Sequence, residues 1–260
     1  MRGRALVRAF RRSTPLCHVY VPQDLTVQDG KYDVLVHFHG VPPNQEANIA
    51  RARLSAVVVS VNLGVGSRGY SSTYARPQAW ERLMAQVAEA TGEVKELEGA
   101  RPGRVAVSAW SAGYASIKSL LDRDAIASQI DAVLVADGLF TSYADNKKKE
   151  VNVRPLERTF AYARMAIRGE KLFVVTHSRV PTFTYPTVEE TTTVMLDTLR
   201  VPRARPSVDL GPLSMKPVYE AHEGGLHVYG YEGDKAGDHI AQIRAMGDVV
   251  YPLLAQRWTR

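Results

Sequence analysis

The sequence predicts an α/β fold: a mainly parallel central β-sheet with helices on both faces, formed by a single domain over residues 1–260. Three observations predict it. Valine-rich apolar runs alternate with segments of helical periodicity, which is the order that a parallel sheet requires. The chain contains no internal repeat and no low-complexity linker. Its 260 residues, 45% of them hydrophobic, are enough for one large core.

The first half of the chain contains three expected strands and two expected helices. Residues 32–40 and 55–64 are apolar runs, and the second is nearly continuous valine, as in a strand covered on both faces. Residues 77–91 predict a helix, because their apolar side chains recur at the helical spacing. Residues 104–109 predict a third strand, and residues 112–122 predict the helix that follows it.

The second half continues the alternation and ends in a helical region. Thr187 and Glu190 form a capping-box pattern, which predicts a helix start at residue 188. Residues 141–170 are the expected place for a small cap over the active-site cleft. The expected elements are, in order, a strand at 131–140, a helix at 155–168, a strand at 171–178, a helix at 188–200, two strands around Gly224 and Gly225, and a helix after His239.

The segment SAWSAG, residues 108–113, joins an expected strand to an expected helix. A serine hydroxyl is a weak nucleophile unless a base takes its proton. Small residues at Ala109 and Gly113 allow a tight turn that exposes Ser111 Oγ and turns the next backbone N–H toward a developing oxyanion. The pattern therefore favours Ser111 as a nucleophile over a serine that only caps a helix.

Four features together resemble the α/β-hydrolase fold superfamily, the serine hydrolases that include esterases, lipases and some peptidases. They are HFHG at 37–40, the SAWSAG segment, an aspartate after a later strand and a histidine near the end. The resemblance covers nearly the whole chain from Tyr32 onward. It departs at Ala109, where the superfamily usually has glycine. It implies a triad in the chain order Ser, Asp, His, with Ser111 as the nucleophile.

The triad base is sought among the histidines downstream of Ser111. His222 and His227 alternate within an expected hairpin and are assigned to strands. His177 ends a strand and stays an alternative. His239 lies in EGDKAGDHIAQ after the last strand, where the resemblance places the triad histidine, and it is the preferred base.

Three aspartates compete for the role of triad acid. The superfamily most often carries this acid after the strand that precedes the last one, but residues 176–179 there contain no carboxylate. Asp137 follows the strand after SAWSAG, where some lipase-like members carry the acid. A carboxylate directly after the apolar VLVA also needs a partner, because burying an unpaired charge is costly. Asp137 is therefore preferred, with Asp234 second and Asp238 third.

The turn after the strand at 32–40 is the second part of the expected oxyanion hole. The resemblance points to the backbone of Gly40 or Val41, acting together with Ala112. His39 is expected to shape this turn. The side chains expected to bind substrate are His39, Tyr70 and Trp110.

Residues 64–69, GVGSRG, match the glycine pattern of dinucleotide-binding loops. Such a site needs a helix that begins directly after the glycines, because its N–H groups bind the pyrophosphate. The sequence places the next helix start near Pro77. The segment is therefore interpreted as an active-site loop, and a nicotinamide-dependent reductase is only a weak alternative.

The expected activity is hydrolysis of a carboxylic ester through an acyl-enzyme. Alternatives are amide or peptide hydrolysis by the same triad, and a non-catalytic binding protein of the same fold. No cofactor is expected. No metal site is expected either, because His37 and His39 have no acids at ligand spacing. The expected partner is a small-molecule ester or acyl substrate, and the sequence does not determine which one, nor the oligomeric state.

Composition excludes several other classes. The net charge of +6 is dispersed apart from residues 147–149, so no nucleic-acid footprint is predicted. Cys17 is the only cysteine, which excludes an internal disulfide. The chain has no apolar run of about 18 residues, so no membrane span is predicted. The basic start lacks the apolar segment of a signal peptide, so a cytoplasmic location is expected, with export left open for a trimmed chain.

Overall fold

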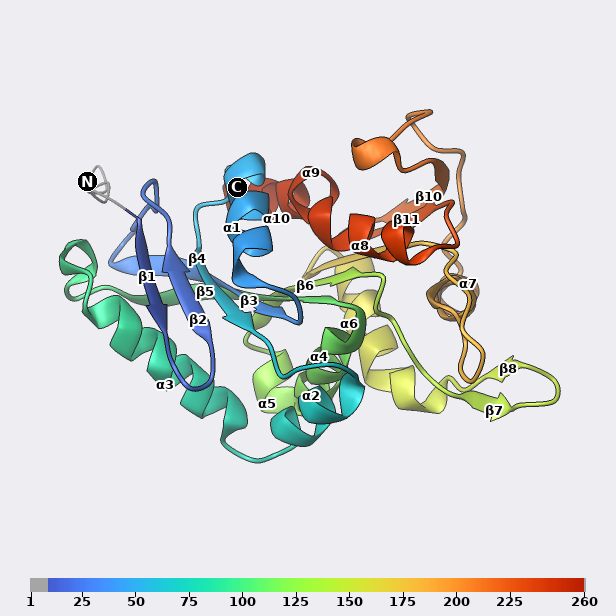
Figure 1. Ribbon diagram of the computed structural model, residues 1–260, viewed down its shortest axis with the longest axis horizontal. Helices are drawn as coiled ribbons and strands as arrows, with labels where there is room; N and C mark the ends of the chain where they lie inside the picture. The colour runs from blue at the N-terminus through green and yellow to red at the C-terminus, as the bar shows by residue number, and fades with distance from the viewer. Residues whose placement is uncertain (1–8, 260) are drawn as a thin grey trace.

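A computed structural model describes residues 9–259. The strands in this range are β1 (Phe10–Ser13), β2 (His18–Val21), β3 (Lys31–Phe38), β4 (Val57–Val61), β5 (Arg101–Trp110), β6 (Ile130–Ala136), β7 (Tyr143–Asp145), β8 (Glu150–Val151), β9 (Leu172–His177), β10 (Pro217–Glu223) and β11 (Leu226–Tyr231). Nine of them form one sheet in the order β1-β2-β4-β3-β5-β6-β9-β11-β10 (Figure 1). The strands from β4 to β11 in this order are parallel, and β1, β2 and β10 pair antiparallel at the two sides. The predicted mainly parallel α/β fold is confirmed.

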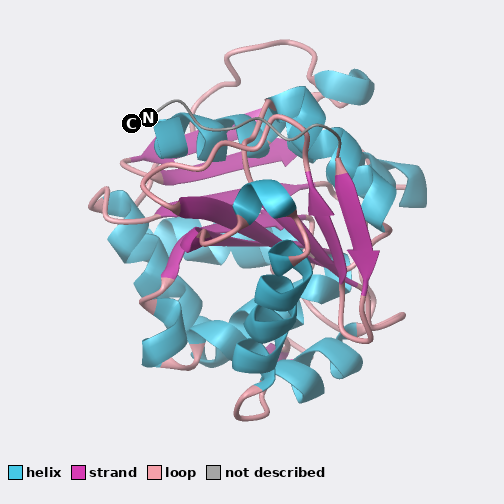
Figure 2. Ribbon diagram, turned by 90° about the vertical axis from the view of Figure 1, so that its left-hand side faces the viewer, coloured by secondary structure: helices cyan, strands magenta, loops and turns pink. Residues whose placement is uncertain are grey.

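Helices cover both faces of the sheet (Figure 2). One face carries α1 (Pro42–Ala52), α8 (Ala236–Arg244), α9 (Met246–Val249) and α10 (Tyr251–Thr259). The other carries α2 (Ser67–Tyr74), α3 (Ala79–Gly92), α4 (Tyr114–Leu121), α5 (Asp124–Ala127), α6 (Glu157–Ile167) and α7 (Val188–Leu199). No helix within residues 9–259 is long and apolar enough to cross a membrane.

Strand β3 shows how the sequence builds two cores from one strand. Successive side chains of a strand point to opposite faces. Val34, Val36 and Phe38 therefore pack with the helical layer of α2, α3 and α4, whereas Leu35 packs with the layer of α1 and α10. Because β3 is apolar on both faces, it lies in the middle of the sheet, and its carboxyl end reaches the candidate site.

Most elements occur within a few residues of their predicted bounds. The helix predicted at 77–91 is α3, which begins two residues later. The capping box is present at the start of α7, where Thr187 Oγ1 accepts from the Glu190 N–H and the Glu190 carboxylate accepts from the Thr187 N–H. The predicted hairpin around Gly224 and Gly225 is the antiparallel pair β10 and β11.

Helix α2 corrects one prediction. It begins at Ser67 with Gly66 as its N-cap, directly within the glycine pattern, so the prediction that no helix starts before about Pro77 was wrong. Its sequence, SRGYSSTY, is poor in strong helix formers. Tertiary packing stabilises it instead, because Tyr70 and Tyr74 are buried in the core. The argument from helix distance against a dinucleotide site therefore fails.

The segment predicted as a small cap has two parts. Strands β7 and β8 form a two-stranded ribbon that projects from the body of the molecule (Figure 1). Helix α6 instead packs into the main core through Phe160 and Ala163. Of the two parts, only the ribbon lies outside the main core, and that it covers a cleft stays a prediction.

Candidate active site

Ser111 stands on a strained turn between β5 and α4. Its φ is 51°, a left-handed value that non-glycine residues rarely adopt. The turn is held from below at Gly113, where a Cβ atom would lie 2.1 Å from the carbonyl oxygen of Phe38. Only glycine permits this close approach of α4 to β3. The local backbone thus has the sharp strand-to-helix geometry that raises a serine side chain above the sheet.

Asp137 stands on a second strained turn, one strand away. It follows β6, has a φ of 46° and is 3% exposed. The next residue, Gly138, passes against the serine turn, and a Cβ there would lie 2.8 Å from the Ser111 carbonyl oxygen. The two turns are therefore packed together, which places Asp137 beside the nucleophile candidate.

The buried Asp137 carboxylate has three close donors. His239 Nδ1 lies 2.8 Å from Oδ2, the Ser178 hydroxyl donates to Oδ2 at 2.5 Å, and the Ser178 N–H donates to Oδ1 at 3.1 Å. These bonds offset the cost of burying a charge. Ser178 directly follows β9, the neighbour of β6 in the sheet. Sequence reasoning missed its role, and the only available signal was its position directly after that strand.

His239 lies in the first part of α8 and contacts the turn of Ser111 through Trp110. The Trp110 Nε1–H donates to the carbonyl oxygen of His239 at 2.9 Å, and the two rings lie 4.7 Å apart between centroids. Within residues 9–259, Ser111 Oγ and His239 Nε2 make no hydrogen bond. Catalytic hydrogen bonds are often long in ligand-free sites.

The alternative residues lie elsewhere. His177 is 1% exposed, and its ring contacts the Ser178 carbonyl and the Tyr219 hydroxyl at 3.0 and 2.7 Å. Burial lowers the pKa of His177. His222 and His227 face each other across β10 and β11. Asp238 caps its own helix by accepting from the Lys235 N–H.

The turn after β3 presents two unused backbone donors. The N–H groups of Gly40 and Val41 donate no hydrogen bond within residues 9–259. Ala112 lies in the short 3₁₀ turn Ser111–Gly113, whose first N–H groups have no partner inside the turn. These are the groups that the sequence assigned to the oxyanion hole, and that role stays a prediction.

His37 fixes the shape of this turn from beneath. Its Nε2 lies 2.7 Å from the His39 carbonyl oxygen, and its Nδ1 lies 2.8 Å from Ser108 Oγ. The Gln45 side-chain amide nitrogen lies 3.0 Å from the same Nε2, so three groups hold the ring in place. Burial lowers the pKa of His37 to about 3, so the ring stays neutral.

His39 and Tyr70 link the turn after β3 to the glycine-rich segment. His39 Nδ1 lies 2.9 Å from the Tyr70 hydroxyl, which also accepts from the Leu63 N–H at 3.0 Å. Tyr70 is fully buried, so it supports His39 from behind. The His39 ring stacks on Trp110 at a centroid distance of 5.0 Å. That His39, Tyr70 and Trp110 bind substrate stays a prediction.

Comparison with known proteins shows similarity at the level of structure. No family model matches the chain, and no curated protein matches it. A cold-adapted esterase from an Arctic intertidal metagenomic library is 12% identical, with a TM-score of 0.50 over 99% of this chain and 97% of that one. A propionate-bound thermophilic esterase from the planctomycete Thermogutta terrifontis is 16% identical, with a TM-score of 0.50 over 97% and 93% of the two chains.

The chain has the α/β-hydrolase fold. Identities this low establish the fold alone. In an α/β-hydrolase fold, chemistry is concentrated at the carboxyl edge of the sheet. Ser111, Asp137, Ser178 and the turn after β3 all lie directly after parallel strands and therefore at this edge.

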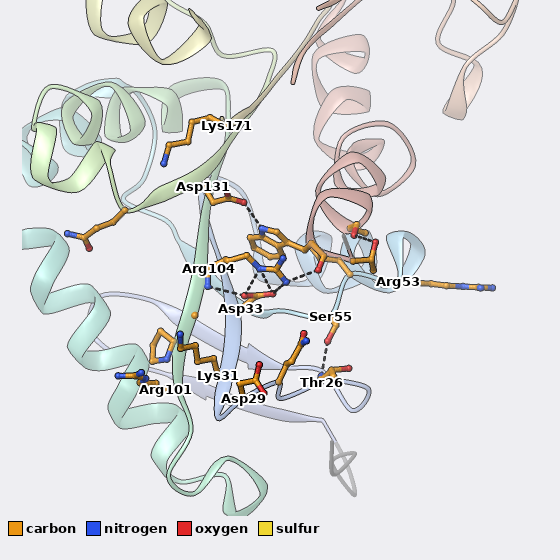
Figure 3. A pocket seen from close by; sticks show the side chains of 18 of the residues that line it. Thr26, Asp29, Lys31, Asp33, Arg53, Ser55, Arg101, Arg104, Asp131 and Lys171 are labelled. Atoms are coloured by element: carbon orange, nitrogen blue, oxygen red, sulfur yellow. Dashed lines mark hydrogen bonds and ion pairs between the residues drawn. The ribbon is translucent and has the colours of Figure 1, made fainter. Parts of the chain in front are cut away.

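A large hollow of about 1220 Å³ lies at the opposite, amino edge of this α/β-hydrolase sheet (Figure 3). Two of its three acids are paired with arginines: Asp33 with Arg104 at 2.6 Å, and Asp131 with Arg257 at 2.8 Å. Arg104 also donates to the Trp258 carbonyl at 2.7 Å, so these bonds fasten α10 beneath the sheet. None of the predicted site residues lines this hollow.

Residues 9–259 contain no group of three or more His, Cys, Asp or Glu side chains placed to hold a metal ion.

Proposed function

We propose that this chain is a serine hydrolase that cleaves a carboxylic ester with Ser111, His239 and Asp137. The observation that carries the proposal is the 2.8 Å contact between His239 Nδ1 and the buried Asp137 carboxylate, beside a serine with a φ of 51°. A buried carboxylate, an imidazole and a serine on a strained turn are the parts of a nucleophilic triad. The fold is compatible with this activity.

In the proposed first step, Ser111 Oγ attacks the carbonyl carbon of the ester while its proton passes to His239 Nε2. The contact with Asp137 fixes the proton of the neutral ring on Nδ1, which leaves Nε2 free to accept. The negative charge on Asp137 then stabilises the imidazolium. His239 returns the proton to the departing alcohol, and the acyl group stays on Ser111.

In the second step, water attacks the acyl-enzyme. His239 Nε2 takes one proton from the water, and Ser111 Oγ leaves with that proton as the carboxylic acid is released. The N–H groups of Ala112 and of Gly40 or Val41 are the proposed donors to the oxyanion in both steps. These groups belong to separate turns, one of them held by the buried His37.

The test compares Ser111→Ala with Ser119→Ala, a control on α4 whose hydroxyl bonds only to its own helix. We expect Ser111→Ala to lower turnover by about 10⁶-fold, as loss of a triad nucleophile does, and Ser119→Ala to leave it unchanged. The measurement is hydrolysis of p-nitrophenyl esters of graded chain length beside aminoacyl anilides. The two structures named above are esterases, so esters come first in the panel.

A fluorophosphonate probe gives an independent readout. It should label Ser111 in the folded wild-type protein, but label neither Ser111→Ala nor the heat-unfolded chain. Hydrolysis that persists in Ser111→Ala, or a folded wild type that neither hydrolyses nor takes up the probe, contradicts the proposal. Faster cleavage of anilides than of esters would replace the ester assignment by amide hydrolysis with the same residues.

A further inference from the structure

The indole of Trp110 packs against two imidazole rings. It stacks on His39, with centroids 5.0 Å apart and planes 12° apart. It also packs against His239, with centroids 4.7 Å apart and planes 31° apart. These three side chains come from the turn after β3, the end of β5 and α8. The proposed base thus rests against an aromatic surface.

Trp110 also binds the backbone that carries the proposed base. Its Nε1–H donates to the carbonyl oxygen of His239 at 2.9 Å. Trp110 directly precedes Ser111, so this bond joins the backbone of α8 to the strained turn. A single side chain therefore contacts both the backbone of α8 and the ring of His239.

Several titratable groups lie near His239, and they determine how strongly the indole face can interact with its ring. Asp137 contacts the ring directly, and His39 is near enough for the charge of His239 to act on it. Tyr70 contacts His39, and Asp238 and Lys235 belong to the start of the helix that carries His239. Burial, and secondly the charge of His239, lower the pKa of His39. A positive charge on His239 therefore disfavours a second positive charge on His39.

We infer that Trp110 is a positioning residue for His239. Its N–H holds α8 against the turn of Ser111, and its ring face stabilises the imidazolium that forms when Ser111 gives up its proton, because an aromatic face attracts a neighbouring cation. The inference rests on the proposed function for its catalytic consequence. The contact between the indole and a titrating imidazole can be measured without any substrate.

The first experiment measures this contact by fluorescence. A protonated imidazole quenches an indole that it touches, so the emission of the wild-type protein should fall in one step as His239 is protonated. Trp80 and Trp258 supply the constant background. The step should be absent in Trp110→Phe, and a step at the wild-type midpoint should be absent in His239→Gln. Absence of the step in the wild type, or its persistence in His239→Gln with an unchanged midpoint, overturns the inference.

The second experiment measures the pKa of His239 by NMR in the wild type, Trp110→Phe and Trp110→Leu. Removing the aromatic face should lower this pKa by about 0.5 in Trp110→Leu. Trp110→Phe keeps a ring and should stay within about 0.2 of wild type; it is also the variant to rely on if the leucine variant does not fold. A pKa in Trp110→Leu equal to that of the wild type overturns the inference.

Kinetics then separate positioning from substrate contact, with Trp80→Phe as the matched control away from the site. Trp110→Leu should lower kcat about tenfold with little change in KM, and shift the acid limb of its pH profile to lower pH. Trp110→Phe should lose about threefold in kcat, because only the hydrogen bond is lost. A raised KM with unchanged kcat and acid limb would make Trp110 a substrate contact instead. If no substrate is turned over, the proposed function fails, while fluorescence and NMR still decide the stack.

Discussion

Two aspartates lie at opposite ends of the same strand, β6, and their surroundings differ. Asp131, near the start of the strand, accepts from Arg257 Nη2 at 2.8 Å and from Trp258 Nε1 at 2.8 Å. Asp137, just past the end, contacts His239 and Ser178. The Asp131 side chain is 22% exposed and the Asp137 side chain 4% exposed. The more deeply buried acid is the one without a permanent cation.

The difference indicates how a structural carboxylate differs from the one proposed to take part in catalysis. Burial alone would raise the pKa of Asp131, but the hydrogen bonds from Arg257 and Trp258 outweigh it and lower that pKa. Arginine does not release its proton in proteins, so the Asp131–Arg257 ion pair keeps its charges. Histidine, unlike arginine, can give up and take up a proton, as the proposed mechanism requires of the partner of Asp137.

The largest expected effect is on turnover, in Asp137→Asn. The asparagine keeps the shape but lets His239 adopt the wrong tautomer, a change that costs about 10⁴-fold in the triad of serine proteases. The unfolding midpoint should change little in comparison. The measurement is kcat on the best ester, with recovery expected at high pH. Asp234→Asn is the control and should be much milder; an exchange of the two phenotypes would refute Asp137 as the acid.

The next effect is on stability, in Asp131→Asn. The change leaves the Arg257 guanidinium half-buried without its counter-charge, which we expect to cost about 2–3 kcal/mol of unfolding free energy. Turnover should stay within about twofold of wild type, because Asp131 lies at the opposite edge of the sheet. Urea unfolding and ester hydrolysis measure the two quantities. A large loss of turnover without loss of stability would contradict the structural role assigned to Asp131.

A smaller effect is expected in Ser178→Ala. The hydroxyl bond to Asp137 is lost while the backbone bond from Ser178 remains. A hydrogen bond to a charged group is worth about 1.5–3 kcal/mol, so kcat should fall by roughly tenfold or more. Ser128→Ala, at the amino edge, is the matched control and should keep full activity. Equal kcat values in the two variants would remove Ser178 from the site.

Acid should lower the unfolding free energy in two separate pH ranges, one set by His37 and one set by Asp131. The pKa of His37 falls from 6.5 to about 3 on folding, so the unfolded chain takes up a proton that the folded chain does not. Below pH 6.5 the unfolding free energy should therefore decline by about 1.4 kcal/mol per pH unit for this group. The pKa of Asp131 is lowered from 3.8, so its contribution is lost only below that value.

Single substitutions identify which group causes the loss of stability in each pH range. His37→Gln should flatten part of the decline between pH 6.5 and 4, and His227, whose pKa is about 4, should account for another part. Asp131→Asn should flatten only the region below pH 3.8. Thermal unfolding across this range measures both. An unchanged slope above pH 4 in His37→Gln would show that this ring does not carry the effect.

The sequence alone was sufficient to predict those elements whose structure is determined by their own residues. The valine run of β4 is buried along its whole length, and such a run predicts an interior strand. Helices α1 and α2 were missed because their sequences, PPNQEANIARA and SRGYSSTY, carry few apolar side chains. Their stability comes from contacts with distant parts of the chain, which local periodicity does not reveal.

The same distinction applies to the candidate site. Ser111 and Asp137 could be proposed from position, since each follows an apolar strand. The contact between Asp137 and His239, 102 residues apart, depends on how strand ends meet across the sheet. Ser178 and Trp110 had no chemical signal in the sequence for what they do, because their roles consist only of contacts with other site residues.

The nearness of Asp137 to Ser178 has an evolutionary consequence. The two residues end adjacent strands, and the Ser178 hydroxyl lies 2.5 Å from the Asp137 carboxylate. A carboxylate introduced at 178 would therefore occupy almost the same space as the one at 137. A lineage could move the acid from one strand to the next through two substitutions, passing through an ancestor that carried both carboxylates with one of them protonated. The position of the acid along the chain would then record descent, while the point in space that it occupies stayed constant.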